Sequence, residues 1–580
     1  MNDLISIFKK DLHRLISDLK KINIINNINF ESINIDYSSK SKRGDLSTNI
    51  LLILRKKNID ENFDINKYVS NFLNNLIYIE SIEIAKAGFV NAFIKKKYLI
   101  SKLKNLFIDS SNKNKKDEQR LKINIEFVSA NPTGPIHVAH MRGAVLGDVL
   151  ASILQSTGHD VLREYYVNDA GSQIIILGKS LFKRYQQLLG QKVKLTEEDY
   201  PGEYLKEIAK NIVNTDQKKW LLYENTEVRE KYFQKYAVNF LIKNIKHDLS
   251  LINIYFDKFT FESQIVEGKF IKKVFSLLKE NHLLYEGVLK KPLGDENNNW
   301  KPRKQLLFRS SNFSDDVDRP FKKVDGQWTY FANDAAYHYE KYTRGFDKLI
   351  NIWGADHIGY ISRMKSITDV VTKNNNYLEI FICQIVRLIK DGKLLKMSKR
   401  EGNFVTLKEI FNEVGKDALR YFMISSKSET PMDFDMNKVI EKNKDNPVFY
   451  CQYAYARASS VIRKASQFKK IPKIQDSFDL FDLSTVSKYE WEIILKMLSW
   501  PYVLIQAAEY RQPHRITNFL EEIASQFHSF WNKGKENASL RMIDENNVNK
   551  TLTKLIWIES FRMTLFQAFQ IIGINAPDVM

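Results

Sequence analysis

Two histidines, His137 and His140, stand three residues apart directly after a turn that contains two prolines and a glycine. The turn follows a strand-like segment, so the histidines are predicted to lie on one face of the first turn of a helix. A helix N-terminus offers unpaired N–H groups and partial positive charge, which suit phosphate. Imidazoles there can donate hydrogen bonds as negative charge builds in a transition state. The same pair could also be two surface or core histidines.

A second chemical feature is the basic segment that reads Lys-Met-Ser-Lys at Lys396–Lys399. Gly392 and Gly402 flank it, and a glycine at each end favours a mobile loop. Lys396 and Lys399 could reach the β- and γ-phosphates of a nucleotide held at the histidine helix. Taken alone, the segment is more typical of a solvated basic loop.

The elements that must position these groups alternate between strand and helix from Leu121 to about Val405. Residues 123–128 and 162–167 are strand-like, and residues 141–154 between them are helix-like. This alternation predicts a parallel sheet with crossover helices. After Phe411 the pattern is almost wholly helical, which predicts a helical bundle from segments 450–468, 491–510, 516–531 and 551–572.

The chain has 580 residues and a mass of 68.0 kDa, more than one hydrophobic core usually supports, so several domains are expected. A polar run at 110–116 is typical of a domain linker. Residues 1–20 follow the pattern of an amphipathic helix and lack the apolar core of a signal peptide. No apolar run is long enough to cross a bilayer, so we expect a cytoplasmic protein without membrane contact.

Charge and cysteine content narrow the partners and cofactors. There are 88 basic and 69 acidic residues, a formal charge of +19, which favours a polyanionic partner such as nucleic acid. Drift in base composition towards Lys, Ile and Asn explains the charge equally well. Cys383 and Cys451 are too few for a thiolate zinc site or a disulfide framework, so we expect a reducing compartment, no structural zinc and no protein metal site.

Together the two motifs, with an α/β segment between them and a helical tail after them, resemble class I aminoacyl-tRNA synthetases, whose signatures are His-Ile-Gly-His and Lys-Met-Ser-Lys. Within that class the chain most resembles the arginyl-tRNA synthetase family, over nearly its whole length. The supporting stretches are residues 166–173, 262–264, 330–338, 353–357, 417–420, 446–454 and 576–580.

The resemblance implies a multidomain α/β fold built on a Rossmann-type parallel sheet. Its expected parts are an N-terminal additional α/β domain at 1–110, which meets the tRNA elbow, and a catalytic domain at 116–405 with an insertion around 195–315. A junction or stem-contact region at 406–445 and a helical anticodon-binding domain at 446–580 follow. The implied reaction activates L-arginine with ATP and Mg²⁺ and transfers it to tRNA(Arg), and the enzyme is expected to be a monomer.

The resemblance also carries residue roles. ATP would meet His137, Ala139, His140, Lys396, Met397, Ser398 and Lys399, of which the two histidines and two lysines are catalytic. Ala139 departs from the family's usual glycine, and its methyl narrows the approach of adenine, so at most a modest change in ATP affinity is expected.

A guanidinium is planar, always protonated and forked, so its pocket should contain carboxylates. Glu262 and Asp334 are the matching positions, and Tyr330 lies one helical turn before Asp334, so both side chains could face one cavity. By the resemblance, Ser129, Asn131, His137 and Asp356 would hold the amino-acid backbone and Glu126 would support the pocket. Each carboxylate alone could equally be a surface residue.

Contacts with tRNA are expected at both ends of the chain. Tyr450 and Tyr453 match family positions near anticodon bases, where aromatic rings can stack on unpaired bases. Trp531 and Met580 are further candidates. Aromatic residues at helical spacing are also typical of a core, so this alternative stays open.

Three other functions remain. Another class I synthetase is the nearest. However, cysteinyl enzymes need zinc-binding cysteines that this chain lacks. Editing enzymes need a large inserted domain, for which there is little room between Gln173 and Glu262. A nucleotidyltransferase would not need the helical C-terminal domain. A non-catalytic tRNA-binding paralogue is disfavoured by the intact histidines and lysines.

Overall fold

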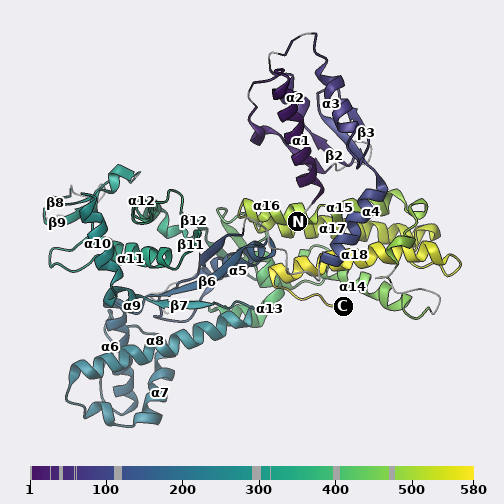
Figure 1. Cartoon of the computed structure of the whole chain (residues 1–580). Helices are drawn as coiled ribbons and strands as arrows, with labels where there is room; N and C mark the ends of the chain where they lie inside the picture. The colour runs from purple at the N-terminus through teal and green to yellow at the C-terminus, as the bar shows by residue number, and fades with distance from the viewer. Residues whose placement is uncertain are drawn as a thin grey trace. The chain divides into compact units, whose positions relative to one another are not determined.

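The computed structural model describes residues 3–26, 28–37, 44–57, 59–60, 62–109, 120–289, 302–313, 315–395, 405–468, 474 and 477–580. The chain divides into two compact units (Figure 1). One is Lys116–Ile440, and the other combines Met1–Lys115 with Glu441–Met580. The predicted segment Lys396–Lys399 lies outside the described residues.

The unit Lys116–Ile440 contains a five-stranded sheet in the order β12-β11-β5-β6-β7, and every pair in it is parallel. The chain runs outward from β5 through β6 to β7, then returns to the other side of β5 for β11 and β12. A topological switch point therefore lies between β5 and β11, where ligands bind at the carboxyl edge of such sheets. The strands are β5 (Lys122–Glu126), β6 (Asp160–Val167), β7 (Lys258–Phe261), β11 (Lys348–Gly354) and β12 (Leu378–Cys383).

Helices cover both faces of this sheet. α5 (Val138–Ser156) packs on the face of Ile352 and Phe127, so closely that a Cβ at Gly147 would stand 2.2 Å from the ring of Phe127. α11 (Tyr330–Thr343) covers the opposite face, to which Asn351 and Glu126 point. Because side chains alternate along a strand, one sheet presents an apolar face to α5 and a polar one to α11.

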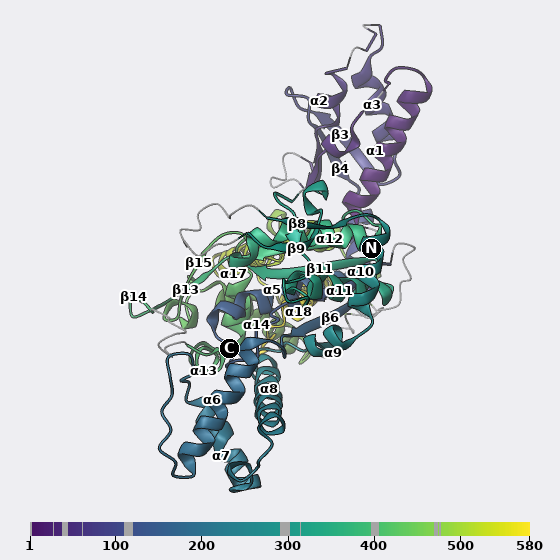
Figure 2. The same cartoon turned by 90° about the vertical axis from the view of Figure 1, so that its left-hand side faces the viewer.

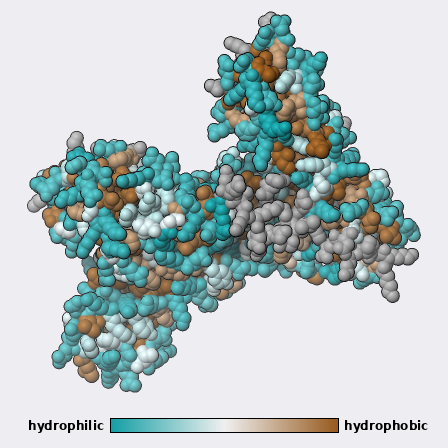
Figure 3. Space-filling model, viewed as in Figure 1, coloured by the Kyte–Doolittle hydropathy of each residue, from teal (hydrophilic) through white to brown (hydrophobic). Residues whose placement is uncertain are grey.

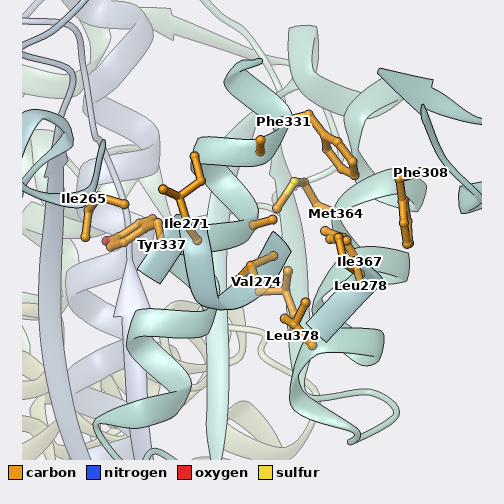
Figure 4. Packing of buried hydrophobic residues seen from close by; sticks show 14 of the residues in the cluster. Ile265, Ile271, Val274, Leu278, Phe308, Phe331, Tyr337, Met364, Ile367 and Leu378 are labelled. Carbon is orange, nitrogen blue, oxygen red and sulfur yellow. The ribbon is translucent and has the colours of Figure 1, made fainter. Parts of the chain in front are cut away.

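Helix α11 belongs to a hydrophobic cluster with two neighbouring helices, α10 (Phe270–Glu280) and α12 (Ile361–Thr372) (Figure 4). Ile271, Val274 and Leu278 recur at helical spacing and face inward, as an amphipathic helix requires. Tyr337 of α11 lies beside Ile265 at the sheet end of this cluster. The small antiparallel sheet β10-β9-β8 adjoins the cluster through β8 (Leu284–Val288), β9 (Lys304–Phe308) and β10 (Arg319–Pro320).

A helical insertion follows β6. It contains α6 (Ser172–Leu188), α7 (Tyr204–Asp216) and α8 (Thr226–Leu251), which lie side by side in both views (Figures 1 and 2). Short helix α9 (Glu262–Glu267) then leaves β7 at the carboxyl edge of the sheet.

In another small sheet, β14-β13-β15, two strands precede the lysine segment in the sequence and one follows it. Its strands are β13 (Val386–Lys390), β14 (Lys393–Leu394) and β15 (Met432–Asp435), and α13 (Leu407–Met423) lies between β14 and β15. The expectation of almost continuous helix after Phe411 is wrong at β15. The alternating apolar residues Met432 and Phe434 are buried there, and the strand pairs in parallel with β13.

The second unit joins an N-terminal α/β part to a helical part. The first contains α1 (Leu4–Lys21), α2 (Ile50–Leu54), α3 (Ile65–Asn74), α4 (Lys96–Asp109) and the sheet β1-β2-β4-β3, with strands Ile35–Tyr37, Leu46–Thr48, Val90–Ile94 and Ile79–Ile84. The second contains α14 (Pro447–Ala465), α15 (Lys488–Leu498), α16 (Trp500–Glu509), α17 (His514–Glu536) and α18 (Val548–Ile572). The helical segments predicted from the pattern are confirmed.

The face of the molecule in Figure 3 is mostly hydrophilic with scattered hydrophobic patches. Among the described residues, no helix is long and apolar enough to cross a membrane.

Candidate active site

The turn after β5 departs from ordinary backbone geometry. Val128 has φ +66° and Ser129 has φ +38°, a left-handed region that a β-branched residue rarely adopts. The turn places the Ser129 hydroxyl where it donates to Glu126 Oε1 at 3.1 Å and accepts from the backbone N–H of Tyr166 at 3.0 Å. Strain of this kind persists only where surrounding contacts hold it, and it clusters at functional sites.

The two histidines lie together at the start of α5. His137 is the residue that caps the helix, and its ring centroid lies 4.0 Å from that of His140. The His137 backbone N–H donates to His140 Nδ1 at 3.4 Å. His137 is buried, His140 is half-buried and Ala139 between them is exposed. The predicted arrangement of both rings at one helix N-terminus is therefore present.

Residues just beyond the lysine segment run along the histidine turn. The Val138 N–H donates to Val405 O at 3.4 Å, and the Leu407 N–H donates to Ile136 O at 2.9 Å. His137 and Thr406 form an antiparallel bridge between these two contacts. The segment Lys396–Lys399 itself lies outside the described residues, and the described chain resumes at Val405, beside the histidines.

Arg142 braces the histidine helix. It lies one turn after His137 on α5, is buried, and donates to Thr430 O at 2.6 Å, Lys427 O at 2.8 Å and Ser426 Oγ at 3.0 Å. These acceptors immediately precede β15, which pairs with β13. The guanidinium therefore joins the histidine helix to the strands from which the lysine segment departs.

Two carboxylates, Glu262 and Asp334, lie near the carboxyl edge of the sheet, Glu262 at the start of α9 and Asp334 on α11. Glu262 begins α9 and is buried, and its Oε1 accepts from Asn333 Nδ2 at 3.3 Å. Asp334 Oδ2 accepts from the Tyr360 hydroxyl at 2.9 Å. Within the described part of the chain neither carboxylate has a cationic partner, unlike most of the acidic side chains buried around them.

Burial without a cation raises the pKa of both groups. It raises the pKa of Glu262, and the charge of Asp169 adds to the rise. It raises the pKa of Asp334 to about 7, with further contributions from the charges of Glu262 and Glu126 and against the stabilising bond from Tyr360. The pair thus forms a strongly cation-attracting site.

A layer of paired charges lies deeper under α11. Lys341 Nζ, fully buried, contacts Glu126 Oε2 at 2.6 Å, and Arg344 contacts Glu164 at 2.7 Å. Although burial opposes it, the charges of Lys341 and Arg344 hold the pKa of Glu164 below its ordinary value. These ion pairs hold Glu126 in position, and Glu126 in turn accepts the hydrogen bond from Ser129.

His338 of α11 lies in the same buried layer and is a neutral imidazole. Burial and the charge of Lys341 lower its pKa to about 4. Its Nδ1 lies 2.8 Å from Asp334 O, so Nδ1–H donates there and Nε2 accepts from Asn351 Nδ2 at 3.0 Å. The ring therefore joins the backbone of Asp334 to strand β11.

The remaining predicted residues of this unit lie around the same edge. Asn131 is exposed, donates to Gln173 Oε1 at 2.9 Å and accepts from Asn168 Nδ2 at 2.5 Å. Tyr330 is 62% exposed, and its hydroxyl lies 3.3 Å from where a Cβ on Gly171 would stand. Asp356 is exposed just beyond β11, with Oδ2 3.5 Å from His357 Nε2.

In the other unit, three of the predicted aromatic residues gather around Arg457. Its guanidinium carbon lies 4.1 Å from the ring centroid of Tyr453 and 5.1 Å from that of Trp531, and it donates to His528 Nδ1 at 2.9 Å. The ring of Tyr450 lies 4.3 Å from that of His528. Burial, with a smaller effect of Arg457, lowers the pKa of His528 to about 4. Tyr450, Tyr453 and Trp531 are half-buried, whereas His528 is buried.

Met580 ends the chain and is 48% exposed. Nearby, Gln452 Nε2 donates to Asn575 O at 3.0 Å and so ties the C-terminal segment to α14.

Comparison with known proteins decides the family. Residues 102–452 match the model of the class I (R) tRNA synthetase catalytic domain, residues 2–94 the arginyl-tRNA synthetase N-terminal domain, and residues 451–580 the DALR anticodon-binding domain. The arginine–tRNA ligases of Ehrlichia ruminantium and Pelagibacter ubique are 40% and 41% identical over 96% and 99% of this chain, covering 97% and 100% of their own length.

The chain belongs to the arginyl-tRNA synthetase family. It is an arginine–tRNA ligase, an enzyme that forms aminoacyl-tRNA. A Campylobacter jejuni structure assigned to arginyl-tRNA synthetase is 32% identical over 84% of this chain and all of its own, with a TM-score of 0.72. The Thermus thermophilus arginyl-tRNA synthetase is 19% identical over 99% of this chain and all of its own, with the same TM-score, and shares its fold.

Several residues that matter for the synthetase site were not predicted. Lys341, Tyr360 and Asn333 hold or contact the carboxylates, and Arg142 braces the histidine helix. A usable signal existed for Lys341, because it lies seven residues after Asp334 and thus on the same face of a helix. The pairing of Lys341 with Glu126 crosses 215 residues of sequence and had no local signal.

Proposed function

We propose that Glu262 and Asp334 bind the guanidinium of L-arginine in the ATP-dependent reaction of this ligase. The observation that carries the proposal is the pair of carboxylates without a cationic partner among the described residues, at the carboxyl edge of the sheet. A guanidinium stays protonated at any working pH and can supply paired hydrogen bonds to carboxylates. Binding it would pair charges that the folded chain leaves unpaired.

The amino-acid backbone would lie nearer the histidine turn. Ser129, Asn131, His137 and Asp356 are proposed to hold its ammonium and carboxylate groups, with Tyr330 at the edge of the pocket. Glu126 supports the pocket through its contacts with Ser129 and Lys341. The strained turn at Val128 keeps these groups at fixed positions, which favours an oriented approach of the carboxylate to ATP.

ATP is proposed to lie over the start of α5, on His137, Ala139 and His140. The lysine segment Lys396–Lys399 would cover the phosphates with Lys396 and Lys399, while Met397 and Ser398 contact the nucleotide. Exposed Ala139 leaves room for adenine at that turn. The support is the hydrogen bonding of Val405 and Leu407, which follow that segment in the chain, along the histidine turn.

The first step is attack of an arginine carboxylate oxygen on the α-phosphorus of ATP. The bond from that phosphorus to the β-phosphate bridging oxygen breaks, and pyrophosphate leaves as its charge is stabilised by the histidines and lysines. In the second step a terminal ribose hydroxyl of tRNA, expected to be the 2′-OH, attacks the arginyl carbonyl and AMP leaves. No covalent enzyme intermediate is needed.

Magnesium is proposed to arrive with ATP. The part of the chain that the structure describes contains no group of three or more His, Cys, Asp or Glu residues placed to hold a metal ion. Mg²⁺ in nucleotide sites is held largely by phosphates and water. We therefore assign no step to a protein-held metal.

The same proposal gives tRNA two contact regions, the N-terminal domain at 1–110 and the anticodon-binding domain at 446–580, with a junction at 406–445 after the catalytic domain at 116–405. Tyr450, Tyr453, Trp531 and Met580 are the proposed base contacts. The partly exposed rings around Arg457 support stacking, because cationic and aromatic groups together suit unpaired bases. A monomeric cytoplasmic enzyme completes the proposal.

The test is ATP–pyrophosphate exchange with each of the twenty amino acids, with and without total tRNA. Exchange should require arginine and be stimulated by tRNA. Exchange that is absent with arginine plus tRNA, or equal with lysine, would refute the proposed pocket.

A further inference from the structure

The hydroxyl of Tyr166 is a buried polar group that the described residues leave without a hydrogen-bond partner. Tyr166 is 6% exposed, and its ring stacks on Tyr337 at 4.3 Å between centroids. A buried hydroxyl is ordinarily hydrogen-bonded, so an unbonded one requires an explanation. In an enzyme, a ligand can supply the missing partner.

The strand register shows where this side chain points. Glu164 and Tyr166 are two residues apart on β6, so both lie on the face that α11 covers. On β7 the register partner of Tyr166 is Thr260, two residues before Glu262. The ring thus lies between the strand that ends in Glu126 and the strand that leads to Glu262.

The electrostatic surroundings agree with this placement. Burial raises the pKa of the Tyr166 phenol, and the next contributions come from the charges of Asp334 and Glu262. The hydroxyl is therefore close enough to both carboxylates to feel their charge, at the pocket proposed for the guanidinium.

A second unbonded acceptor, Asn333 Oδ1, lies in the same place. Asn333 is buried, and its amide nitrogen donates to Glu262, so its oxygen faces away from that carboxylate. The pocket thus holds four acceptor groups of three kinds: two carboxylates, an amide oxygen and a phenol oxygen. A guanidinium has five N–H donors and no acceptor, whereas an ammonium has only three donors at one point.

We infer that Tyr166 is a specificity-determining residue whose hydroxyl oxygen accepts a hydrogen bond from the substrate guanidinium, while Asn333 Oδ1 accepts another. The inference rests on the proposed function of Glu262 and Asp334. The carboxylates select a cation, and the two neutral acceptors select one whose donors are spread over a plane. A lysine ammonium in this pocket would leave one or both of them unbonded, which disfavours it.

The test compares Tyr166→Phe with the unaltered chain in arginine-dependent, tRNA-supported pyrophosphate exchange. The variant should raise KM for arginine by about tenfold to 100-fold, the effect of losing a hydrogen bond to a charged group. It should leave KM for ATP unchanged and lower the ratio of kcat/KM for arginine over lysine. Thermal stability without arginine should be unchanged or higher, because the deleted hydroxyl has no partner to lose.

Tyr377→Phe is the matched control. Tyr377 is also a buried tyrosine of the hydrophobic cluster, but its hydroxyl donates to Phe346 O at 2.9 Å. That variant should lose stability and keep its KM for arginine. An unchanged KM for arginine in Tyr166→Phe, or equal rises in both KM values, would overturn the inference. A wild-type chain without arginine-dependent exchange would instead overturn the proposed function together with it.

Discussion

Two groups of carboxylates lie around α11, and they differ in whether a cation accompanies them. Glu126 and Glu164 are paired with Lys341 and Arg344 inside the fold. Glu262, at the start of α9, and Asp334, on α11, have no cationic partner among the described residues and accept hydrogen bonds from Asn333 and Tyr360. The paired group joins the sheet to α11, and the unpaired group is the one proposed above to bind the substrate guanidinium.

The paired group explains how the fold can tolerate a pocket of unpaired carboxylates. Uncompensated carboxylates repel one another and destabilise a fold when they are ionised. Here they lie next to a layer whose own charges are neutralised by Lys341 and Arg344. In the proposed function, the bound guanidinium supplies the counterion that Asp334 and Glu262 lack among the described residues.

The largest effect is expected from breaking the paired group. Lys341→Met should lower the free energy of unfolding by about 3–5 kcal/mol, because it leaves Glu126 buried without its partner. Urea unfolding measures this. The double variant Lys341→Met/Glu126→Gln should recover much of the loss, and a single variant as stable as the wild type would contradict the structural role of the pair.

A substitution in the unpaired group should instead weaken the reaction with arginine. Asp334→Asn should lower kcat/KM for arginine by roughly 100-fold to 1000-fold, as expected when one partner of a desolvated charge pair is removed, with KM for ATP little changed. Steady-state exchange kinetics measure both. Asp199→Asn is the control, because Asp199 is paired with Lys183 in the insertion and should not affect arginine. Equal changes in both KM values would exclude Asp334 from the pocket.

The difference between the two groups explains which parts of the site could be predicted from the sequence. The strand, turn and helix around His137 have strong local patterns. The charge of arginine called for carboxylates, and the family resemblance identified Glu262 and Asp334 as the matching positions. Whether a carboxylate has a counterion depends on long-range packing, as in Lys341 and Glu126, and no local pattern encodes that. The left-handed Val128 was equally beyond sequence reasoning, because Val ordinarily signals extended strand.

The ionisation of Asp334 should make the reaction with arginine depend on pH. The pKa of Asp334 is raised to about 7 by burial and by neighbouring carboxylates, so this group is protonated in the free enzyme at lower pH. Since kcat/KM reports the free enzyme, kcat/KM for arginine should fall about tenfold per pH unit below that value. The pH profile of kcat/KM measures this, and Asp334→Asn should flatten the limb. A limb that persists in the variant belongs to another group.

The smallest expected effect is on stability without arginine. The pKa of Asp334 is higher in the folded chain than its ordinary 3.8, so the folded state binds more protons between these values, and stability falls as pH rises from about 4 to 7. Asp334→Asn removes this ionisation and should melt at a higher temperature than the wild type at pH 8 and show no gain at pH 4. Thermal unfolding of the ligand-free chain at both pH values measures it. Arginine should reverse the order at pH 8 by stabilising only the wild type, because the substrate then supplies the counterion that Lys341 and Arg344 supply to the carboxylates beneath.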